Sequence, residues 1–326
     1  MIPFRRLLTV SLGLLALIGP MHTAGAETWP SRPVRIIVPF GPGGTTDIFA
    51  RLVGLHLQTA LSQPVTIENK PGGNFGIGTE AAAKSPADGY TLVMITSSHA
   101  LIEALGVNKQ KYQLMRDLVP VAALSSAQSV LVVHPSIPVK SVKELIALAK
   151  SKPNDLNYGS TGNGSMLHVQ AKLFESMTGT EMTHIPYKVG SNARVDLLTG
   201  RLQFMFDTVD GAATFVRTGK LRALGTTGIH RSVALPEVPT IAESGVPGYE
   251  VQAVIGIMAP AGTPRQVVNL LNAEINKIIT RPEVLEAWAK VDSQVMPMAP
   301  EEFGKKLNAE IVKWASVVKS TNVTMD

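Results

Sequence analysis

Short β-branched or apolar runs alternate along the chain with longer segments in which apolar residues recur at helical spacing. The strand-like runs cover residues 34–39, 65–68, 90–96, 129–134, 202–207, 221–224 and 251–258. The clearest helical stripe follows Pro300, with apolar side chains at Phe303, Leu307, Ile311, Trp314 and Val318. Repeated strand–loop–helix units of this kind predict an α/β fold with largely parallel sheets.

Two helix starts carry capping signals. Ser141 followed by Glu144 forms the pattern of a capping box, in which two side chains bind backbone N–H groups that the first helical turn leaves unpaired. Thr263 is expected to cap another helix, with Pro264 at its first helical position and Gln266 completing a second box. Both patterns predict helices that begin shortly after strand-like runs.

The length of the chain favours two packed units over one. A single hydrophobic core stops growing at roughly 250 to 300 residues. This chain has 326 residues. Because no low-complexity stretch separates two units, we expect the lobes to be joined by strand-like crossings rather than by a flexible linker.

The first 26 residues are typical of a secretory signal peptide and are not expected to belong to the fold. Arg5 and Arg6 give a basic start, an uncharged and mostly apolar run covers residues 7–18, and small residues occupy positions 24–26. A membrane anchor is the alternative, but a run of twelve residues is too short for a hydrocarbon core of roughly 30 Å. We therefore expect cleavage after Ala26 and an exported mature chain without membrane insertion.

Composition removes several classes of function. The chain has no cysteine, which excludes disulfides, thiolate metal sites and a cysteine nucleophile. The net charge of +5 comes from 30 basic and 25 acidic residues that are mixed along the chain, and loss of Arg5 and Arg6 with the signal peptide would leave +3. This mixing indicates no nucleic-acid patch, and the scattered histidines form no metal-binding motif. We therefore expect neither a nucleic-acid partner nor a metal or other cofactor.

A glycine-rich loop follows the first strand-like run and enters a helical segment. Such a loop lets the backbone approach a ligand, and a helix start adds free N–H groups and roughly half a positive charge. The loop lacks the ending of a Walker sequence, and Thr46 stands where a dinucleotide-binding loop has its last glycine. It therefore predicts a site for a carboxylate, although a tight strand–helix turn explains the glycines equally well. We expect Asp47 to brace the loop, because its charge would repel an anion. The candidate residues are Phe40, Pro42, Gly43, Gly44, Thr45 and Asp47.

A second loop of similar composition, residues 158–165, lies in the later part of the chain. It also combines glycines with hydroxyl side chains between a strand-like run and a helical segment. If each lobe carries one loop and the loops face each other across a cleft, two helix termini converge on one ligand. Anion recognition would then rest on backbone N–H groups and on hydroxyls from both loops. The candidate residues are Ser160, Thr161, Gly164 and Ser165.

A catalytic role for the second loop is the main alternative. His168 follows Ser165 by three residues, so a secreted serine hydrolase built on this pair is conceivable, but no G-x-S-x-G elbow and no third member are present. A capping serine beside a hydrogen-bonded histidine explains the pair better, and we expect a binding protein rather than an enzyme. His168 and three more distant residues complete the ligand-binding candidates: Lys188 after a strand-like segment, and Ser97 and Asp207 at predicted strand ends.

At these residues the chain resembles the periplasmic solute-binding receptors of tripartite tricarboxylate transporters, the Bug-type receptors. The resemblance runs from Trp29 to the last helical segment. One such motif would be weak, but the whole set in order is specific. The motifs are Val38-Pro39-Phe40 with Pro42-Gly-Gly44, Asp47 and Ala50-Arg51, then Glu68-Asn69 with Pro71-Gly72, Asp88-Gly-Tyr-Thr-Leu92, Asn157-Tyr-Gly-Ser160 with Gly164-Ser165 and His168, Pro186-Tyr-Lys188, Asp196-Leu-Leu198, Gly219-Lys-Leu-Arg-Ala-Leu224, Leu235-Pro-Glu-Val-Pro-Thr240 and Ala259-Pro-Ala-Gly-Thr-Pro264.

The resemblance implies a two-lobed type II periplasmic binding protein (Venus-flytrap) fold with hinge strands, a periplasmic mature chain and a ligand held between the lobes. Lobe 1 would comprise residues 27–128 and 252–326, and lobe 2 residues 129–251. In the family, two strand–helix loops, here residues 40–47 and 160–168, grip a ligand carboxylate with ordered water. Family ligands are mostly small carboxylates, and the receptor, expected to be a monomer, hands them to membrane permease subunits. Presentation of the ligand to a sensor kinase is an alternative output that the sequence leaves open.

Several positions depart from the family pattern, and they concern the part of the pocket that would set ligand identity. The fold and the carboxylate clamp should survive these changes, whereas the ligand itself is not predicted. The departures are Gly41 for a common proline, Asn74 and Phe75 for a usual glycine pair, Val189 and Asn192 for a glycine and a proline after Lys188, and Val254 for a common tryptophan.

Overall fold

The structure is a computed structural model that describes residues 29–106, 111–321, 323 and 324. The predicted signal peptide, residues 1–26, lies outside these described residues, so it stays a prediction. Within the described part of the chain, no helix is both long enough and apolar enough to cross a bilayer.

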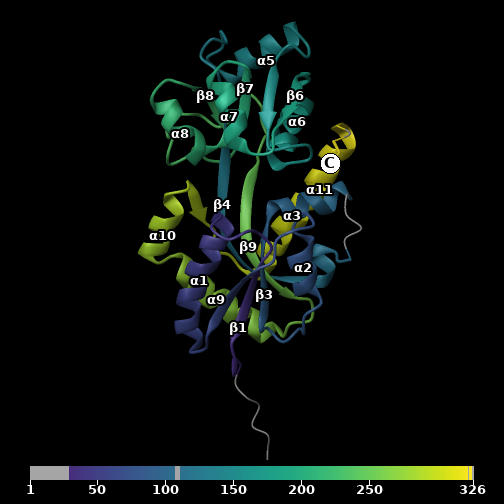
Figure 1. Ribbon diagram of the computed structural model, residues 1–326, viewed down its shortest axis with the longest axis vertical. Coiled ribbons are helices and arrows are strands. Elements are labelled where there is room, and N and C mark those ends of the chain that lie inside the picture. The colour runs from purple at the N-terminus through teal and green to yellow at the C-terminus, as the bar shows by residue number, and fades with distance from the viewer. Residues whose placement is uncertain (1–28, 107–110, 322, 325–326) are drawn as a thin grey trace, which may run out of the picture.

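The described residues form two lobes, one above the other in Figure 1, with helices packed against a ten-stranded sheet. The lower lobe begins with β1 (Val34–Val38), α1 (Thr45–Leu61), β2 (Val65–Asn69), α2 (Gly76–Ala83), β3 (Thr91–Thr96), α3 (Ser97–Leu105) and α4 (Leu114–Asp117). β4 (Leu118–Val133) rises into the upper lobe, which contains α5 (Val142–Ser151), β5 (Asn157–Ser160), α6 (Met166–Thr178), β6 (Thr183–Pro186), α7 (Gly190–Leu198), β7 (Phe204–Thr208), α8 (Val209–Arg217) and β8 (Arg222–Thr226). The chain returns through β9 (Gln252–Pro260) and ends with α9 (Arg265–Ile279), α10 (Pro282–Ala289), β10 (Ser293–Val295) and α11 (Pro300–Thr321).

Two strands join the lobes. β4 is 16 residues long; it pairs with β9 up to Gln128 and with β7 and β8 beyond that residue. β9 runs antiparallel to β4 and returns the chain to the lower lobe (Figure 1). The predicted strand-like crossings are therefore confirmed. Periodicity showed only residues 129–134 of β4, because the buried side chains of Ser125, Ser126 and Gln128 interrupt its apolar pattern.

The direction of β4 determines how the two lobes face each other. In the lower lobe, β1 is parallel to β2 and β3, and β3 is antiparallel to β9, so these three strands run toward the upper lobe as β4 does. In the upper lobe, β5 is parallel to β6 and β7, and β7 is antiparallel to β4, so these strands run toward the lower lobe. The carboxyl ends of all six strands, and the helices that begin there, therefore lie at the boundary between the lobes.

Each lobe has its own hydrophobic core, and α11 contributes to both. Phe303 and Leu307 are buried in a cluster of the lower lobe. Trp314, further along the helix, is buried in the main cluster of the upper lobe. Ile311 and Val318 are partly buried between and beyond them. The apolar stripe predicted for this helix is thus confirmed, and the helix spans the seam between the lobes.

The predicted start of α9 is wrong by one position. Thr263 does not cap the helix, because its hydroxyl donates to the Pro260 carbonyl at 2.7 Å. The helix begins at Arg265 with Pro264 in the cap position, and no side chain caps it, so Gln266 completes no box. The Thr263 hydroxyl therefore stabilises the turn before the helix and does not cap the helix itself.

The predicted start of α5 is confirmed in part. Ser141 caps the helix by accepting the Glu144 N–H at 3.2 Å. The Glu144 carboxylate accepts the Lys140 N–H at 2.6 Å instead of returning to Ser141. The acidic residue still binds a backbone donor at the helix start, but one residue earlier than in a capping box.

Candidate ligand-binding site

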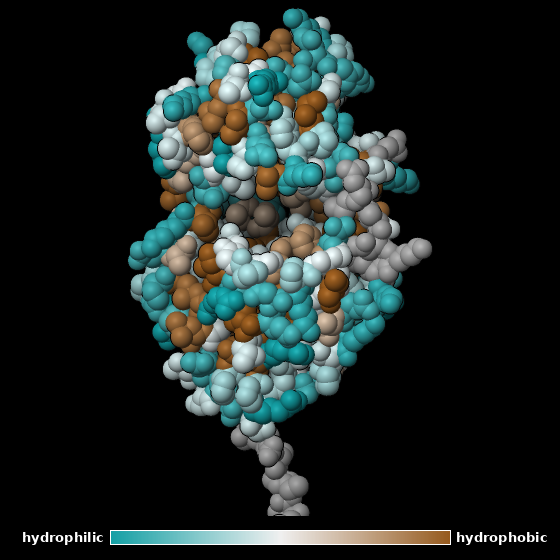
Figure 2. All heavy atoms as spheres, viewed as in Figure 1, coloured by the Kyte–Doolittle hydropathy of each residue, from teal (hydrophilic) through white to brown (hydrophobic). Residues whose placement is uncertain are grey.

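Two glycine-rich loops face each other across the space between the lobes. The first follows β1 and enters α1, the second follows β5 and enters α6, and both lie at carboxyl ends of strands. Figure 2 shows that the surface is hollowed between the lobes. In open α/β sheets, ligands bind outside the carboxyl ends of the strands, so this cleft is the candidate binding site.

The first loop presents an uncapped helix start to open space. Gly44 is the N-cap residue of α1, and no side chain caps the N–H groups of the first turn. A Cβ atom placed on Gly41, Gly43 or Gly44 would meet nothing within 4 Å, so the loop borders empty space. Pro42 and Thr45 are exposed beside these glycines. The loop therefore presents backbone donors and the positive end of a helix dipole to an anion in the cleft.

Asp47 braces the first loop. It is 2% exposed, and its carboxylate accepts hydrogen bonds from the Gly43 N–H at 2.9 Å, Arg51 Nε at 2.9 Å and Asn69 Nδ2 at 2.8 Å. These bonds, that from Arg51 first, lower the pKa of Asp47 to about 2 against the opposing effect of burial. Asn69 also donates to the Phe40 carbonyl at 3.2 Å, which ties the start of the loop to its end. The Gly43 N–H donates to Asp47 and not into the cleft, so Gly43 contributes its left-handed backbone, with φ of 82°, rather than a free donor.

The second loop is braced by a hydroxyl group and has no carboxylate. The hydroxyl of buried Ser160 contacts His184 Nε2 at 2.6 Å and accepts the Gly162 N–H at 3.1 Å. Ser165 caps α6 with its side chain and is partly exposed, and Thr161 is exposed. Of the hydroxyl groups expected to bind a ligand, that of Ser160 therefore holds the loop and that of Ser165 caps α6, whereas the Thr161 side chain is exposed.

His168 positions the second loop and is not arranged as a catalytic base. It is buried, its Nδ1 accepts the Gly164 N–H at 3.1 Å, and its ring stacks on that of His184 with centroids 3.8 Å apart. Burial, followed by His184 and Lys172, lowers the pKa of His168 to about 3, so the ring is neutral. The Ser165 hydroxyl accepts the backbone N–H of His168 at 3.3 Å, while the ring nitrogen faces Gly164. This geometry does not form the nucleophile–base pair that a serine hydrolase needs.

Ser97 and Asp207, the two candidates at strand ends, are occupied by structural contacts. Ser97 is 1% exposed, and its hydroxyl accepts the Val254 N–H at 2.9 Å and donates to the Gln252 carbonyl at 3.3 Å, which ties α3 to β9. Asp207 is 2% exposed and accepts two hydrogen bonds from Arg194, at 2.5 and 2.9 Å. These contacts engage the polar atoms of both side chains, and a role of either residue in ligand binding stays a prediction.

The start of a further helix, α7, lies beside the second loop, and the sequence analysis missed it. Lys188 is exposed in the turn after β6, and the Tyr187 N–H donates to the Ser160 carbonyl at 3.0 Å, which fixes this turn next to the loop. α7 begins at Gly190, with Val189 in the cap position and no side-chain cap. A second uncapped helix start therefore lies at the cleft. The sequence did not predict this helix start, because neither a capping residue nor a strong apolar stripe marks the helix.

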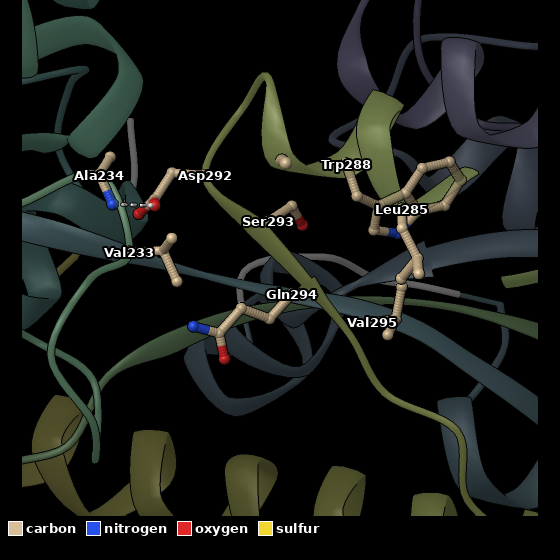
Figure 3. A pocket seen from close by; sticks show the side chains of 9 residues that line it. Val233, Ala234, Leu285, Trp288, Asp292, Ser293, Gln294 and Val295 are labelled. Carbon is tan, nitrogen blue, oxygen red and sulfur yellow. Dashed lines mark hydrogen bonds between the residues drawn. The ribbon is translucent and has the colours of Figure 1, made fainter. Parts of the chain in front are cut away.

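A separate pocket lies at the seam between the lobes (Figure 3). It has a volume of about 460 Å³ and is lined mainly by apolar side chains, among them Trp288 of α10 and Val233 of the upper lobe. Beside it, the Asp292 carboxylate accepts hydrogen bonds from the Ser232 hydroxyl at 3.0 and 2.9 Å and from the Ala234 N–H at 3.3 Å. Burial raises the pKa of Asp292. A carboxylate ligand would meet an acidic group and apolar walls here, so this pocket is a poorer anion site than the cleft.

Comparisons with known proteins agree with this geometry. A family model described as "Tripartite tricarboxylate transporter family receptor" matches residues 49–323. "Protein BugT" of Bordetella pertussis is 37% identical over 321 residues, which cover 98% of each chain. A solved structure described as R. palustris Rpa4515 with adipate is 33% identical with a TM-score of 0.74, covering 91% of this chain and 99% of that one. A TctC solute binding protein from Polaromonas, described as having no ligand, is 27% identical with a TM-score of 0.82, covering 90% and 100%.

Proposed function

The chain belongs to the tripartite tricarboxylate transporter receptor family, a family of periplasmic solute-binding receptors and not of enzymes, and we propose that it captures a small carboxylate between its lobes and delivers it to the membrane subunits of a tripartite transporter. Its two-lobed fold with hinge strands is that of the periplasmic binding proteins. The hydrolase alternative has no support in the contacts of Ser165 and His168.

One observation carries the proposal: each lobe places an uncapped helix start at the cleft. The N-cap residue is Gly44 in α1 and Val189 in α7, and neither helix has a side-chain cap. The first N–H groups of a helix have no partner within the helix, so donors remain on both sides of the cleft. The helix dipoles add partial positive charge at the same points. A carboxylate satisfies donors and dipoles together, whereas a cation would be repelled by both.

We assign two kinds of role to the residues of the site. Exposed or partly exposed groups beside the cleft would contact the ligand, and buried or bonded groups would hold the loops in place. Ser165, which caps α6 and is partly exposed, would do both. The proposed contact residues are Phe40, Pro42, Gly44, Thr45, Thr161, Ser165 and Lys188. The proposed positioning residues are Gly43, Asp47, Ser97, Ser160, Gly164, His168 and Asp207.

We also propose that the cleft closes on its ligand by bending of the joining strands. Lobe 1 would comprise residues 27–128 and 252–326 and lobe 2 residues 129–251, a division supported by the change of β4 partners after Gln128. The Polaromonas protein without ligand superposes with a higher TM-score than the adipate complex, 0.82 against 0.74, at lower sequence identity. This supports an open arrangement here, which ligand would shift toward the closed one.

Delivery to a membrane partner requires export, so we propose that the signal peptide is removed after Ala26 and that the mature monomer works in the periplasm beside the permease subunits. Loss of ligand uptake in a strain that lacks the protein, with uptake restored by the intact gene, would support delivery. Unchanged uptake with a lost transcriptional response to the ligand would favour presentation to a sensor kinase instead.

The carboxylate site is tested by mass spectrometry of the ligand released when the purified protein is denatured, followed by a thermal-shift panel of acids. The released molecule should be a small, chemically unchanged carboxylate. At 100 times its dissociation constant, such a ligand should raise the free energy of unfolding by roughly 2.7 kcal/mol. If no acid is released and no acid of a broad panel raises Tm, the proposal fails.

A further inference from the structure

Phe75 holds a backbone conformation that glycine normally adopts. Its φ is 70°, and the preceding residue, Asn74, has φ of 50°. A bulky residue in the left-handed region is strained. Strain of this kind persists only where the surroundings hold it, and it is concentrated at functional sites. The turn alone therefore does not explain why a phenylalanine occupies this position.

The Phe75 ring belongs to an aromatic cluster with Phe40 and His99. The ring centroid of Phe75 lies 4.6 Å from that of Phe40 and 5.2 Å from that of His99. His99 is 2% exposed, and burial lowers its pKa to about 4, so it is neutral. Its Nδ1 accepts the Thr96 N–H at 3.0 Å, and its Nε2 contacts Thr79 Oγ1 at 3.2 Å, which fixes the ring. Phe40 and Phe75 are only partly buried, so they form the accessible side of a rigid, uncharged surface.

This aromatic cluster lies at the edge of the cleft, next to the start of α1. Phe40 follows β1, Phe75 is the N-cap residue of α2 after β2, and His99 is in the first turn of α3 after β3. β2, β1 and β3 are neighbours in the sheet, so the three side chains come from one edge. Phe40 also begins the loop that presents the donors at Gly44, and Ile77, in the first turn of α2, is 57% exposed. A carboxylate bound at α1 would therefore have its body beside aromatic and aliphatic surface.

We propose that Phe75 determines ligand specificity by stacking on a flat ring, so that this receptor prefers an aromatic monocarboxylate of the benzoate type. The inference rests on the carboxylate site proposed above. On the facing lobe, Val189 is 53% exposed and would cover the ring when the cleft closes. A stacked or tilted aromatic pair contributes an attraction in addition to the effect of its buried area. This attraction corresponds to about two- to tenfold in affinity, and the buried area increases affinity further.

The test compares benzoate with cyclohexanecarboxylate, which carries the same carboxylate on a ring of similar size that is not flat. Calorimetry on the mature chain should show that the wild type binds benzoate about two- to tenfold more tightly. Phe75→Gly relieves the strained backbone and removes the ring, so the variant should fold and bind both acids with similar, weaker affinity. Phe75→Leu, which keeps an apolar side chain, should retain cyclohexanecarboxylate binding and lose the preference for benzoate.

The outcomes separate this inference from the proposal on which it rests. If the wild type binds carboxylates without preferring the aromatic one, specificity through Phe75 is overturned and the carboxylate site stands. If Phe75→Gly binds both acids more tightly than the wild type, Phe75 obstructs the pocket instead of forming a platform, and the inference is again overturned. If no carboxylate binds the wild type, the proposed function fails and this inference fails with it.

Discussion

The two loops that face the cleft are held by opposite kinds of chemistry. The first is braced by an ionised group, because buried Asp47 accepts three hydrogen bonds, one of them from the Arg51 guanidinium. The second is braced without a carboxylate, because the Ser160 hydroxyl contacts His184 and the neutral His168 ring accepts the Gly164 N–H. Charge-assisted hydrogen bonds are the stronger kind. The only carboxylate of the two loops is thus turned inward and paired, which leaves the helix ends as the charge that an anion in the cleft would meet.

The largest effect is expected when a negative charge is placed on the outer side of the first loop. Gly44→Asp has room, because a Cβ there meets nothing within 4 Å and φ is −80°. Two carboxylates ~4 Å apart repel by about 4 kcal/mol at an effective dielectric constant of 20, so affinity for a carboxylate should fall at least about 100-fold. Aspartate is a good N-cap residue, so the free energy of unfolding should not decrease. Calorimetry and urea denaturation measure the two quantities.

Two variants sharpen that result. Gly44→Ala adds the Cβ without the charge, and its affinity should stay within about threefold of the wild type, since the site keeps its electrostatics. Thr161→Asp places the same charge on the second loop and should also weaken binding, because both loops are proposed to hold one ligand. A folded Gly44→Asp variant that binds as tightly as Gly44→Ala would contradict the proposed placement of the ligand.

Removal of the charge from the brace of the first loop should have the next largest effect. Asp47→Asn loses the charged acceptor of the Arg51 and Gly43 donors, and hydrogen bonds to charged groups contribute about 1.5–3 kcal/mol. The free energy of unfolding should fall by that amount in urea denaturation. The matched control is Glu286→Gln, which breaks an exposed pair with Lys290 and should cost less than about 1 kcal/mol. Equal effects of the two substitutions would show that Asp47 braces nothing.

The hydroxyl group that braces the second loop should contribute less to stability. Ser160→Ala removes the hydroxyl that the Gly162 N–H and His184 Nε2 share, and a typical hydrogen bond contributes about 0.5–1.5 kcal/mol. Urea denaturation should therefore show a smaller loss than for Asp47→Asn. Ser151→Ala, at an exposed hydroxyl, is the control and should be nearly silent. A loss larger than that of Asp47→Asn would reverse the comparison between the loops.

The smallest effect should be that of pH on ligand affinity, measured between about pH 5 and 8. The pKa of Asp47 is about 2 and that of His168 about 3, so neither of these two groups changes its charge in this range. Affinity for an acid that stays ionised should vary less than about threefold in calorimetry across these pH values. A tenfold change would show that a group titrating near neutrality contacts the ligand.

Stability should respond to pH where affinity does not. The pKa of His168 is lower in the folded chain, about 3, than the usual 6.5, so the unfolded chain takes up this proton first. The free energy of unfolding should therefore fall as pH drops from 6.5 toward 3. For Asp47, stabilisation is present above 3.8 and is lost as pH falls toward 2. Urea denaturation of the wild type and of His168→Gln would show a shallower decline below pH ~6.5 in the variant.

Local signals explain what the sequence predicted well. Glycines followed by hydroxyl residues at a strand–helix junction gave both loops, and Asp47 in a first helical turn was correctly expected to brace its loop. The stripe that begins at Phe303 gave the last helix, because its spacing alone reveals a buried face. The order of the elements, and hence the α/β class, follows from the same kind of signal, whereas the two lobes were expected from the chain length and from the family resemblance.

Contacts between distant residues explain what it could not predict. Asp207, at the end of β7, was a secondary candidate for ligand binding, and the sequence did not show that Arg194 of α7 binds both of its oxygens. Ser97 was likewise expected in the cleft, yet its hydroxyl is bonded to the backbone of β9. The uncapped start of α7 at Gly190 was missed because no residue type marks it. A polar side chain at a strand end therefore indicates a candidate, and only its partners show whether it is available.

The most direct measurement is an NMR titration of the mature protein with the carboxylate that it binds, following the backbone amide resonances. The largest shifts should occur at Gly44 and Thr45 in the first loop and at Thr161 and Gly190 in the upper lobe, and all should saturate with one dissociation constant. Shifts confined to one lobe, or centred on the seam pocket beside Trp288, would contradict a ligand held by helix ends from both lobes.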